Sequence, residues 1–317
     1  MRTLEVGRND GGQRLDKFLS KKFKNMPKSL MYKYIRKKCI KLNGKKCDID
    51  TRINEGDILT FYIKDEFFED VPETYDFMKA PIKLDIIYED DQIMLLNKKP
   101  GLIVHPDENY HFDSLIARVQ HYLYDKGEYD PKDENSFAPA LVNRIDRNTG
   151  GIVIAAKTAA ALRILNQKLR DRELHKYYLC AAVGKFKAKE ALLTDYLEKN
   201  EKQNRVYITP KPTANSKTIK TRYKVIAENK GLSLLEVDLL TGRTHQIRAH
   251  MAYIGHPLVG DGKYGKNEIN RKYGQKWQAL YSYKLSFDFT TDAEELSYLN
   301  GKTFTAPEVW FVKEWFY

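Results

Sequence analysis

Near the start of the chain, apolar residues recur at the three-to-four-residue spacing of an amphipathic helix. The pattern predicts one helix that opens at Arg14 and a second that runs to Lys38. Pro27 separates the two, and Ser29 is expected to cap the second helix. The segment is therefore predicted to hold two short helices.

The rest of the chain mixes strands and helices, and several of its segments alternate apolar and polar residues, the spacing of β-strands. Residues 39–46 enter a turn at Asn43-Gly44, a dipeptide that favours a tight hairpin. Two more helices are expected, one over 158–172 with Thr158 as its cap and one over 245–254. Further strands are predicted at Ile58–Ile63, Leu84–Tyr88, Ile93–Asn97, Gly151–Lys157, Tyr177–Val183, Arg222–Ala227 and Leu232–Leu240. Because the helices are too few for a doubly wound parallel fold, the predicted class is α+β with a mixed, mainly antiparallel sheet.

Charge divides the chain of 317 residues, whose length suggests about two domains. The net charge is +11, and residues 1–65 hold 17 basic and 8 acidic residues, a net of +9. Between Lys17 and Lys46 there are 12 Lys and Arg and no acid, which indicates a polyanion partner, most often nucleic acid. Residues 65–76 are acidic and resemble a linker. We therefore predict a basic α/β module over 12–65, a linker over 66–80 and a larger domain over 81–317.

Several classes of protein do not fit the composition. No apolar run approaches the roughly 18–20 residues of a membrane span, and the N-terminus lacks the apolar core of a signal peptide. The three cysteines show no C-x-x-C spacing, which does not fit a disulfide framework or a thiolate zinc site. The simplest setting is a reducing cytoplasm.

A dense polar segment, residues 143–151, lies between two apolar stretches. Its Asp146 stands between Arg144 and Arg147, and nearby positive charge favours the ionised form of a carboxylate. The glycine pair Gly150-Gly151 permits a tight turn and the close approach of a ligand. The segment is either a catalytic loop or a solvated loop whose aspartate bonds a turn.

A second polar segment, residues 240–250, follows a strand and opens a helix. Its side chains, Arg243 and Arg248 among them, cannot all be accommodated in an apolar core, and the guanidinium fork suits carboxylate or phosphate. His245 and His250 are five residues apart and do not share a helical face, which argues against a metal site.

Two other segments only partly match known motifs. Residues 260–266 fit most of the phosphate-loop pattern, but Asn267 stands where a Ser or Thr should bind magnesium. His105 follows Lys99-Pro100-Gly101 in a turn, a setting more typical of a structural or RNA-facing histidine. We therefore expect neither a cofactor nor a metal ion.

Taken in order, these segments resemble the RluA-type pseudouridine synthases. The motifs R-[LI]-D-x-x-T-x-G, K-x-Y, T-G-R-T-H-Q-I-R-x-H and G-H-P-x-x-G-D-x-x-Y-G stand at Arg144–Gly151, Lys176–Tyr178, Thr241–His250 and Gly255–Gly265. The resemblance covers about Leu84 to Phe289, residues 98–106 are similar to the entrance motif of the family, and residues 12–65 are similar to an S4-like RNA-binding domain. It implies a catalytic domain of pseudouridine synthase type that isomerises uridine in RNA. In this reaction the N-glycosidic bond is cleaved, the uracil turns and a C–C bond re-forms to the same ribose.

The resemblance also implies roles for individual residues. Asp146 is expected to be the catalytic carboxylate, Arg248 to pair with it and Tyr178 to stack on the uracil. Arg144 is expected to fill the gap left by the flipped nucleotide, since the reacting atoms are inaccessible in stacked RNA. Further RNA contacts are predicted for Arg147, Arg243, His245, Gln246, His105, Lys37, Lys38, Lys45 and Lys46. The combination with an S4-like module is most similar to large-subunit (23S) ribosomal RNA synthases, with transfer RNA as the alternative substrate and a monomer as the expected state.

Two positions depart from the family pattern. Asn143 replaces the common histidine before the arginine, and Gly150 replaces the serine of T-S-G. Neither change removes the carboxylate or its cationic partner.

Two other functions compete with the synthase. A non-catalytic RNA-binding or ribosome-assembly protein would explain the basic module but would not require the set of Asp146, Tyr178 and Arg248. A glycosidase would normally need two carboxylates at its site, and around Asp146 and Arg248 the sequence shows one.

Overall fold

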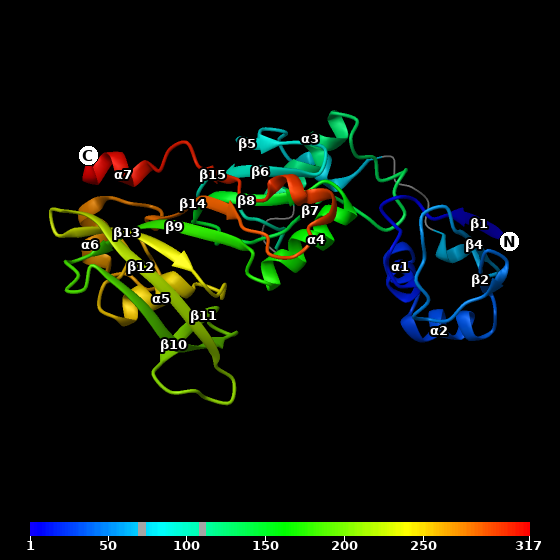
Figure 1. Cartoon of the computed structure of the whole chain (residues 1–317), viewed down its shortest axis with the longest axis horizontal. Helices are drawn as coiled ribbons and strands as arrows, with labels where there is room; N and C mark the ends of the chain where they lie inside the picture. Colours follow the sequence, from blue (N-terminus) through cyan, green and yellow to red (C-terminus); the bar gives the residue numbers. More distant parts are fainter. Residues whose placement is uncertain (69–73, 108–111) are drawn as a thin grey trace.

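The computed structural model describes residues 1–68, 74–107 and 112–317. Figure 1 shows a small N-terminal unit at one end of the molecule and a larger unit built around a long sheet. The C-terminal helix lies at the far end from the N-terminus. In the part of the chain that the structure describes, no helix is long and apolar enough to cross a membrane.

The small unit combines two helices with a four-stranded antiparallel sheet in the order β1-β4-β2-β3. Its elements are β1 (Arg2–Glu5), α1 (Leu15–Lys22), α2 (Lys28–Arg36), β2 (Ile40–Leu42), β3 (Lys45–Lys46) and β4 (Ile58–Phe61). Phe18, Leu19 and Phe61 are buried between the helices and the sheet. Because β1 pairs with β4, the folded unit begins before the predicted boundary at residue 12.

Of two local predictions for this unit, the hairpin at Asn43-Gly44 is present and the helix cap at Ser29 is not. The hairpin is confirmed: Asn43 and Gly44 have φ values of 49° and 73°, the left-handed pair that a tight hairpin turn requires. The predicted cap at Ser29 is wrong, because α2 begins at Lys28 after Pro27 and no side chain caps it. Proline fixes its own φ and suits the start of a helix, so it takes this place.

The larger unit contains, within the described residues, an eleven-stranded sheet. Nine strands follow the order β11-β10-β12-β13-β9-β14-β8-β6-β5, with β15 beside β14 and β7 beside β8. All pairs are antiparallel except β8 with β14, which confirms the mixed, mainly antiparallel sheet. The strands are β5 (Ile86–Glu89), β6 (Ile93–Lys98), β7 (Ala140–Leu141), β8 (Gly150–Ala156), β9 (Leu174–Val183), β10 (Glu190–Asn200), β11 (Arg205–Thr209), β12 (Lys217–Asn229), β13 (Leu232–Leu239), β14 (Leu280–Phe287) and β15 (Thr303–Thr305).

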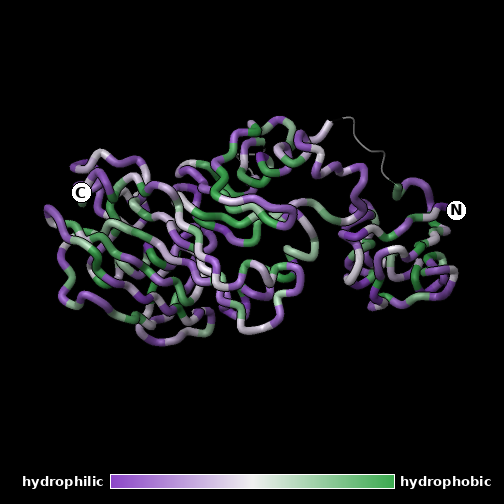
Figure 2. The backbone as a smooth tube through the Cα atoms, turned by 45° about the horizontal axis from the view of Figure 1, so that its top comes forward, coloured by the Kyte–Doolittle hydropathy of each residue, from purple (hydrophilic) through white to green (hydrophobic). Residues whose placement is uncertain are grey.

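Helices cover both faces of this sheet. The helices are α3 (Leu115–Asp125), α4 (Ala159–Arg170), α5 (Gln246–Tyr253), α6 (Asn267–Tyr273) and α7 (Trp310–Phe316), with short 3-10 helices at Asp65–Phe67, Asp76–Lys79 and Glu294–Leu299. Helices α3 and α5 pack on one face, and α4 and α7 pack on the other. Figure 2 shows the apolar backbone segments concentrated in the central strands between these layers.

Most of the predicted elements in this unit are present. Helix α4 begins as expected, because the Thr158 hydroxyl accepts a hydrogen bond from the Ala161 N–H at 3.1 Å. The six strand segments predicted between 84 and 240 all lie in the sheet. Eight strands and α-helices of this unit were not predicted: β7, β10, β11, β14, β15, α3, α6 and α7. The long β10–β11 hairpin is half exposed on both sides, so its apolar spacing is weak.

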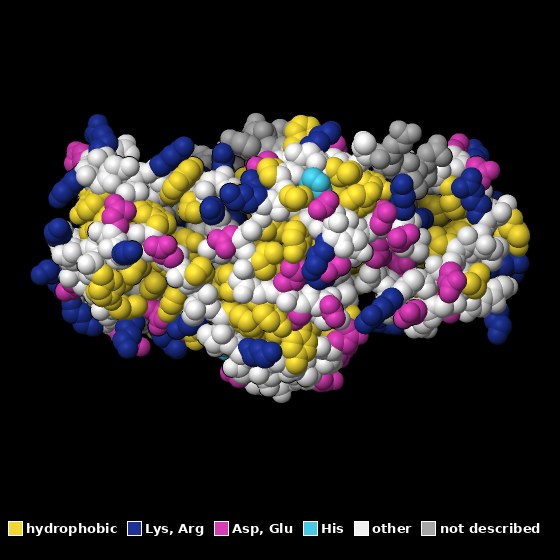
Figure 3. Space-filling view, turned by 90° about the horizontal axis from the view of Figure 1, so that it is seen from above, with side chains coloured by type: hydrophobic (Ala, Val, Ile, Leu, Met, Phe, Trp, Pro, Cys, Tyr) yellow, Lys and Arg dark blue, Asp and Glu magenta, His cyan; other side chains and the backbone are white. Residues whose placement is uncertain are grey.

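Polar contacts join the two units. The buried Asp10 carboxylate accepts hydrogen bonds from Asn135 Nδ2 at 2.9 Å and Ser136 Oγ at 2.6 Å. Asn9 Nδ2 donates to Glu134 Oε1 at 2.6 Å, and Lys22 Nζ donates to Asn135 Oδ1 at 3.1 Å. Figure 3 shows acidic side chains gathered where the small unit adjoins the larger one. Within the predicted linker, residues 69–73 lie outside the described residues.

Candidate active site

Asp146 meets Arg248 across 102 positions of sequence. Arg248 Nη1 donates to Asp146 Oδ2 at 2.7 Å, from the first turn of helix α5 to the loop that precedes β8. The Asp146 side chain is 26% exposed, whereas that of Arg248 is 8% exposed. The carboxylate can therefore meet a ligand while its ionic partner stays inside the protein.

A third residue, Asp261, binds the two guanidinium nitrogens of Arg248 that do not contact Asp146. Arg248 Nε and Nη2 donate to the two Asp261 oxygens at 2.7 and 2.9 Å, a bidentate pair, and Asp261 is fully buried. Asp261 Oδ1 also accepts the backbone N–H groups of Lys263 and Tyr264 at 2.8 and 3.0 Å. The segment that looked like a phosphate loop is thus a turn that wraps the Asp261 carboxylate. Asp261 was not among the predicted site residues, although it stands in the last of the four motifs.

Burial and charge oppose each other in this trio. Burial disfavours the charged forms, but the paired hydrogen bonds outweigh it. The pKa of Asp261 is held below its ordinary value because the hydrogen bonds and charge of Arg248 overcome its desolvation. The pKa of Arg248 is raised above its ordinary value, since Asp261 and Asp146 together overcome the burial of the guanidinium. Arg248 is therefore a permanent cation beside Asp146.

Tyr178 lies in the same core as the Asp146 loop. It is 5% exposed and comes from β9, where it faces the sheet side covered by α3 and α5. Burial raises the pKa of Tyr178 to about 12, with a smaller contribution from the charge of Asp146 and an opposing hydrogen bond with Ser282. The phenol therefore keeps its proton near neutral pH.

Lys98 ties the entrance segment to the Asp146 loop. Its Nζ donates to the carbonyls of Lys99, Leu102 and Arg147 at 3.1, 2.8 and 2.9 Å. The Gly101 N–H also donates to the Arg147 carbonyl at 2.9 Å. Burial lowers the pKa of Lys98 to about 7, against the pull of the Asp146 charge.

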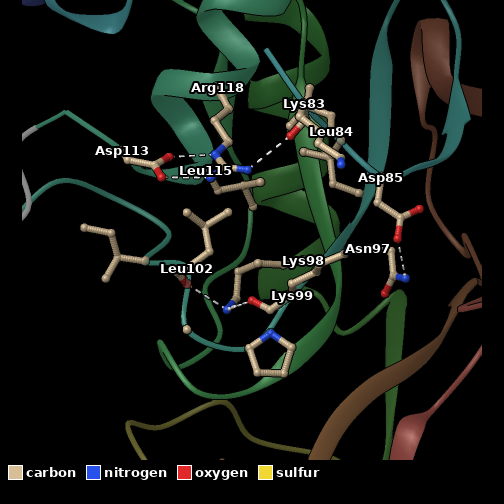
Figure 4. Close-up of a pocket in the computed structure, with 14 residues that line it drawn as sticks. Lys83, Leu84, Asp85, Asn97, Lys98, Lys99, Leu102, Asp113, Leu115 and Arg118 are labelled. Carbon is tan, nitrogen blue, oxygen red and sulfur yellow. Dashed lines mark hydrogen bonds and ion pairs between the residues drawn. The ribbon is translucent and has the colours of Figure 1, made fainter. Parts of the chain in front are cut away.

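A cavity of about 560 Å³ lies beside this junction, next to the Lys98–Leu102 turn. Figure 4 shows Lys98 directed at the Leu102 carbonyl, with Arg118 bound to Asp113 on another wall. Asp146 does not line this cavity. The cavity therefore neighbours the loop of the candidate carboxylate without containing it.

The structure explains both departures from the family pattern. Asn143 Oδ1 accepts the Ile154 N–H at 2.8 Å, so the side chain fastens its loop to β8. A Cβ at Gly150 would lie 2.3 Å from Tyr281 Cε2, so the tyrosine ring occupies the room that a serine side chain would need. Gly151 has φ 108°, and a Cβ there would lie 2.1 Å from the Ser282 carbonyl oxygen. The glycine pair permits close strand packing next to Asp146.

Eight of the ten predicted RNA-binding residues are exposed, as a phosphate contact requires: His105, Arg144, Arg147, Arg243, Lys37, Lys38, Lys45 and Lys46. His245 is partly buried, and Gln246 is buried. Partial burial and the charge of Arg144 lower the pKa of His105. Arg147 Nε donates to the Gly101 carbonyl at 3.1 Å.

Gln246 differs from its prediction. It is 2% exposed, and its amide oxygen accepts hydrogen bonds from the Thr241 hydroxyl and the Arg243 N–H at 2.9 and 3.1 Å. Its amide nitrogen donates to the Lys220 carbonyl and the Thr221 hydroxyl at 3.1 and 3.0 Å. The side chain is thus satisfied inside the protein and fixes the start of α5. A polar residue in a helical motif does not reveal by itself which side it faces.

The arrangement is that of an enzyme site. A partly exposed carboxylate with a buried, permanently charged partner lies in a sheet-based domain, and a small basic module precedes that domain in the chain. These features fit the RNA-modifying enzyme that the motifs predict, with Asp146 as the candidate catalytic carboxylate.

Comparison with known proteins agrees. The profile of RNA pseudouridylate synthases matches residues 92–253, and that of the S4 domain matches residues 13–59. The chain is 33% identical over 298 residues to a ribosomal large subunit pseudouridine synthase C of Vibrio vulnificus, covering 92% of this chain and 89% of that protein. An uncharacterized RNA pseudouridine synthase of Mycoplasma capricolum is 33% identical over 318 residues, covering 96% and 97%.

A solved structure shares the fold. Human RNA pseudouridylate synthase domain containing 1 superposes with a TM-score of 0.58 at 19% identity, over 78% of this chain and 91% of that one. Together with the profile matches, the relatives establish that the chain belongs to the RNA pseudouridylate synthase family and is an isomerase with an N-terminal S4 domain.

Proposed function

We propose that this enzyme converts uridines of large-subunit ribosomal RNA into pseudouridine, with Asp146 as its catalytic carboxylate. The observation that carries the residue assignment is the 2.7 Å contact between the partly exposed Asp146 and the buried Arg248. The choice of RNA is supported by the similarity to ribosomal large subunit pseudouridine synthases of several bacteria.

The role of Asp146 follows from the charge that develops on the ribose. Cleavage of the N-glycosidic bond leaves an electron-poor ribose carbon. An ionised carboxylate can attack that carbon, stabilise it or take the adjacent proton. The hydrogen bond from Arg248 holds the Asp146 carboxylate in one orientation. The ion pair with Asp261 keeps the Arg248 guanidinium itself in place. The carboxylate is thereby pre-positioned before RNA binds.

Tyr178 and Arg144 act on the uridine and on the helix it leaves. Tyr178 is 5% exposed and protonated near neutral pH; we assign its ring to stacking on the uracil, as the family resemblance implies, and its hydroxyl is close enough to feel the charge of Asp146. Arg144 is exposed two residues before Asp146, where its planar cation can occupy the gap left by the extruded nucleotide. Unstacking costs a few kcal/mol, which such an insertion offsets in part.

The basic module supplies affinity for the RNA backbone. We assign this task to residues 12–65 together with β1, connected through 66–80 to the catalytic residues of 81–317. Its lysines contact phosphates and carry little sequence information. Further phosphate or base contacts come from the exposed Arg147, Arg243 and His105. The enzyme acts as a monomer in the cytoplasm.

Tritium release from RNA labelled at C5 of uridine tests the proposal. The wild-type chain should release tritium from ribosomal RNA without added metal or nucleotide, and Asp146→Asn should abolish release while RNA binding stays within about threefold. Asp171→Asn, an exposed carboxylate in the helix α4 cap, is the matched control and should retain full activity. Release by Asp146→Asn at the wild-type rate would refute the assignment.

Transfer RNA and a purely RNA-binding role are the alternatives. Mapping pseudouridines in a deletion strain separates the two substrates, since a lost transfer-RNA site with an intact ribosomal map would overturn our choice. If the protein only binds RNA or assists ribosome assembly, the Asp146→Asn variant should still perform its cellular role.

A further inference from the structure

His245 is a second basic side chain that approaches Asp146. It precedes α5 with φ 53° and ψ 17°, a left-handed conformation that is uncommon for a residue with a side chain. Its side chain is 10% exposed, and its Nε2 lies 3.8 Å from Asp146 Oδ2. Such backbone conformations persist where the surroundings impose them, often at functional sites. The imidazole is therefore held in place next to the catalytic carboxylate.

Tyr264 fixes the far side of the imidazole. The Tyr264 hydroxyl lies 3.0 Å from His245 Nδ1 and accepts the Val206 N–H at 2.9 Å. The Tyr264 backbone N–H is bound to Asp261, and its ring lies 5.3 Å from the Arg248 guanidinium carbon. The phenol is thus anchored to the same turn that holds Arg248.

These contacts favour one tautomer of the imidazole. Because the Tyr264 oxygen already accepts a hydrogen bond from Val206, its own hydrogen is available for donation to His245 Nδ1, 3.0 Å away. A neutral imidazole that accepts at Nδ1 carries its proton on Nε2. The Nε2–H group then faces Asp146 Oδ2. At 3.8 Å the pair is longer than a hydrogen bond, and catalytic hydrogen bonds often shorten only in the complex with substrate.

We propose that Tyr264 and His245 are a pair of positioning residues: Tyr264 sets the tautomer of His245, whose Nε2–H restrains Asp146 as a second donor besides Arg248. The proposal rests on the proposed catalytic role of Asp146. No role was predicted for Tyr264, and His245 was predicted only to contact RNA.

The charges around the imidazole agree with a neutral donor. Burial lowers the pKa of His245 to about 4, helped by Arg248 and Lys263 and opposed by Asp146 and Asp261. Burial likewise raises the pKa of Tyr264, whose ring also faces Arg205. Near neutral pH, the imidazole is therefore uncharged and the phenol keeps the hydrogen that it donates.

The first experiment measures tautomers without relying on activity. In the full chain with ¹⁵N-labelled histidines, His245 is assigned among the 7 histidines by its loss in His245→Gln. We expect Nδ1 and Nε2 shifts of a neutral ring protonated at Nε2 at pH 7. In Tyr264→Phe this preference should weaken, and the pKa of the ring should rise because the neutral form loses the hydroxyl that donates to Nδ1. A ring protonated at Nδ1 in the wild type would overturn the proposal, whatever the enzyme does.

The second experiment measures tritium release between pH 5 and 9. Tyr264→Phe should lower kcat about 10- to 100-fold with KM changed less than threefold, and its kcat should gain an acidic limb that the wild type lacks in this range. His245→Gln, which keeps an N–H donor but cannot titrate, should retain at least tenfold more activity than His245→Leu and show no such limb. Equal losses in the two His245 variants, or an unchanged pH profile in Tyr264→Phe, would refute the pair. Absence of release by the wild-type chain would instead refute the proposed function.

Discussion

Asp261→Asn is the most informative substitution, because it changes one atom of a buried carboxylate that no RNA can reach. Asp261 Oδ1 accepts three hydrogen bonds, from Arg248 Nη2, Lys263 N and Tyr264 N, whereas Oδ2 accepts one, from Arg248 Nε at 2.7 Å. An asparagine therefore fits best with its NH₂ group at the Oδ2 position. At that position the NH₂ group would face the Arg248 Nε–H, and two donors cannot form a hydrogen bond with each other.

The cost can be worked from these contacts. One hydrogen bond between charged groups contributes about 1.5–3 kcal/mol, and breaking a buried ion pair completely costs about 3–5 kcal/mol. Because Arg248 keeps Asp146 as an ionic partner and one hydrogen bond to the new side chain, we expect a loss of about 3 kcal/mol in the free energy of unfolding. The guanidinium should also shift toward Asp146 and misalign it.

Urea unfolding and tritium release measure the two effects. We expect kcat to fall roughly 100-fold, equivalent to about 2.7 kcal/mol, with KM nearly unchanged because Asp261 lies outside the RNA surface. Asp195→Asn is the matched control, since that carboxylate binds His250 Nε2 at 3.0 Å on the same helix but has no hydrogen bond to Arg248. A stability loss with unchanged kcat would show that Asp261 supports the fold and does not orient the catalytic carboxylate.

Four further predictions concern packing, titration and the basic module. Gly150→Ala should cost about 1–3 kcal/mol through overpacking against Tyr281, and in urea unfolding the pair with Tyr281→Ala should cost less than the sum; additive costs would contradict the steric account. The folded pKa of Lys98 is about 7 and its ordinary value is 10.5, so the unfolded chain binds more protons between them; wild type should gain stability relative to Lys98→Met as pH rises through this window, and a flat difference would argue against the shift. Asp10→Ala should release the small unit and raise the radius of gyration in X-ray scattering, whereas an unchanged value would show that other contacts suffice. Removing four exposed lysines of the module together should flatten the salt dependence of RNA binding, and an unchanged slope would place them away from the RNA. These lysines are Lys37, Lys38, Lys45 and Lys46.

Features set by neighbours in the chain could be predicted from the sequence. The Thr158 cap, the Asn43-Gly44 hairpin and the short apolar run of β8 each depend on a few consecutive residues. The ordered motifs also indicated the family and singled out Asp146. Local reasoning failed at Ser29, where Pro27 competes for the start of the helix, and at Gln246, whose amide turns inward.

The tertiary structure decided which polar residues meet. Arg248 reaches Asp146 across 102 positions and Asp261 across 13, and no periodicity records such pairings. Asp261 looked like part of a phosphate loop because glycines and a lysine surround it; only the fold shows that its carboxylate points inward at an arginine. Gly150 likewise looked like a departure from a motif until Tyr281 was found against it. The sequence by itself determined the residue types, the local elements and the family. The fold determined which side chains become partners, because that depends on where distant strands and helices bring them together.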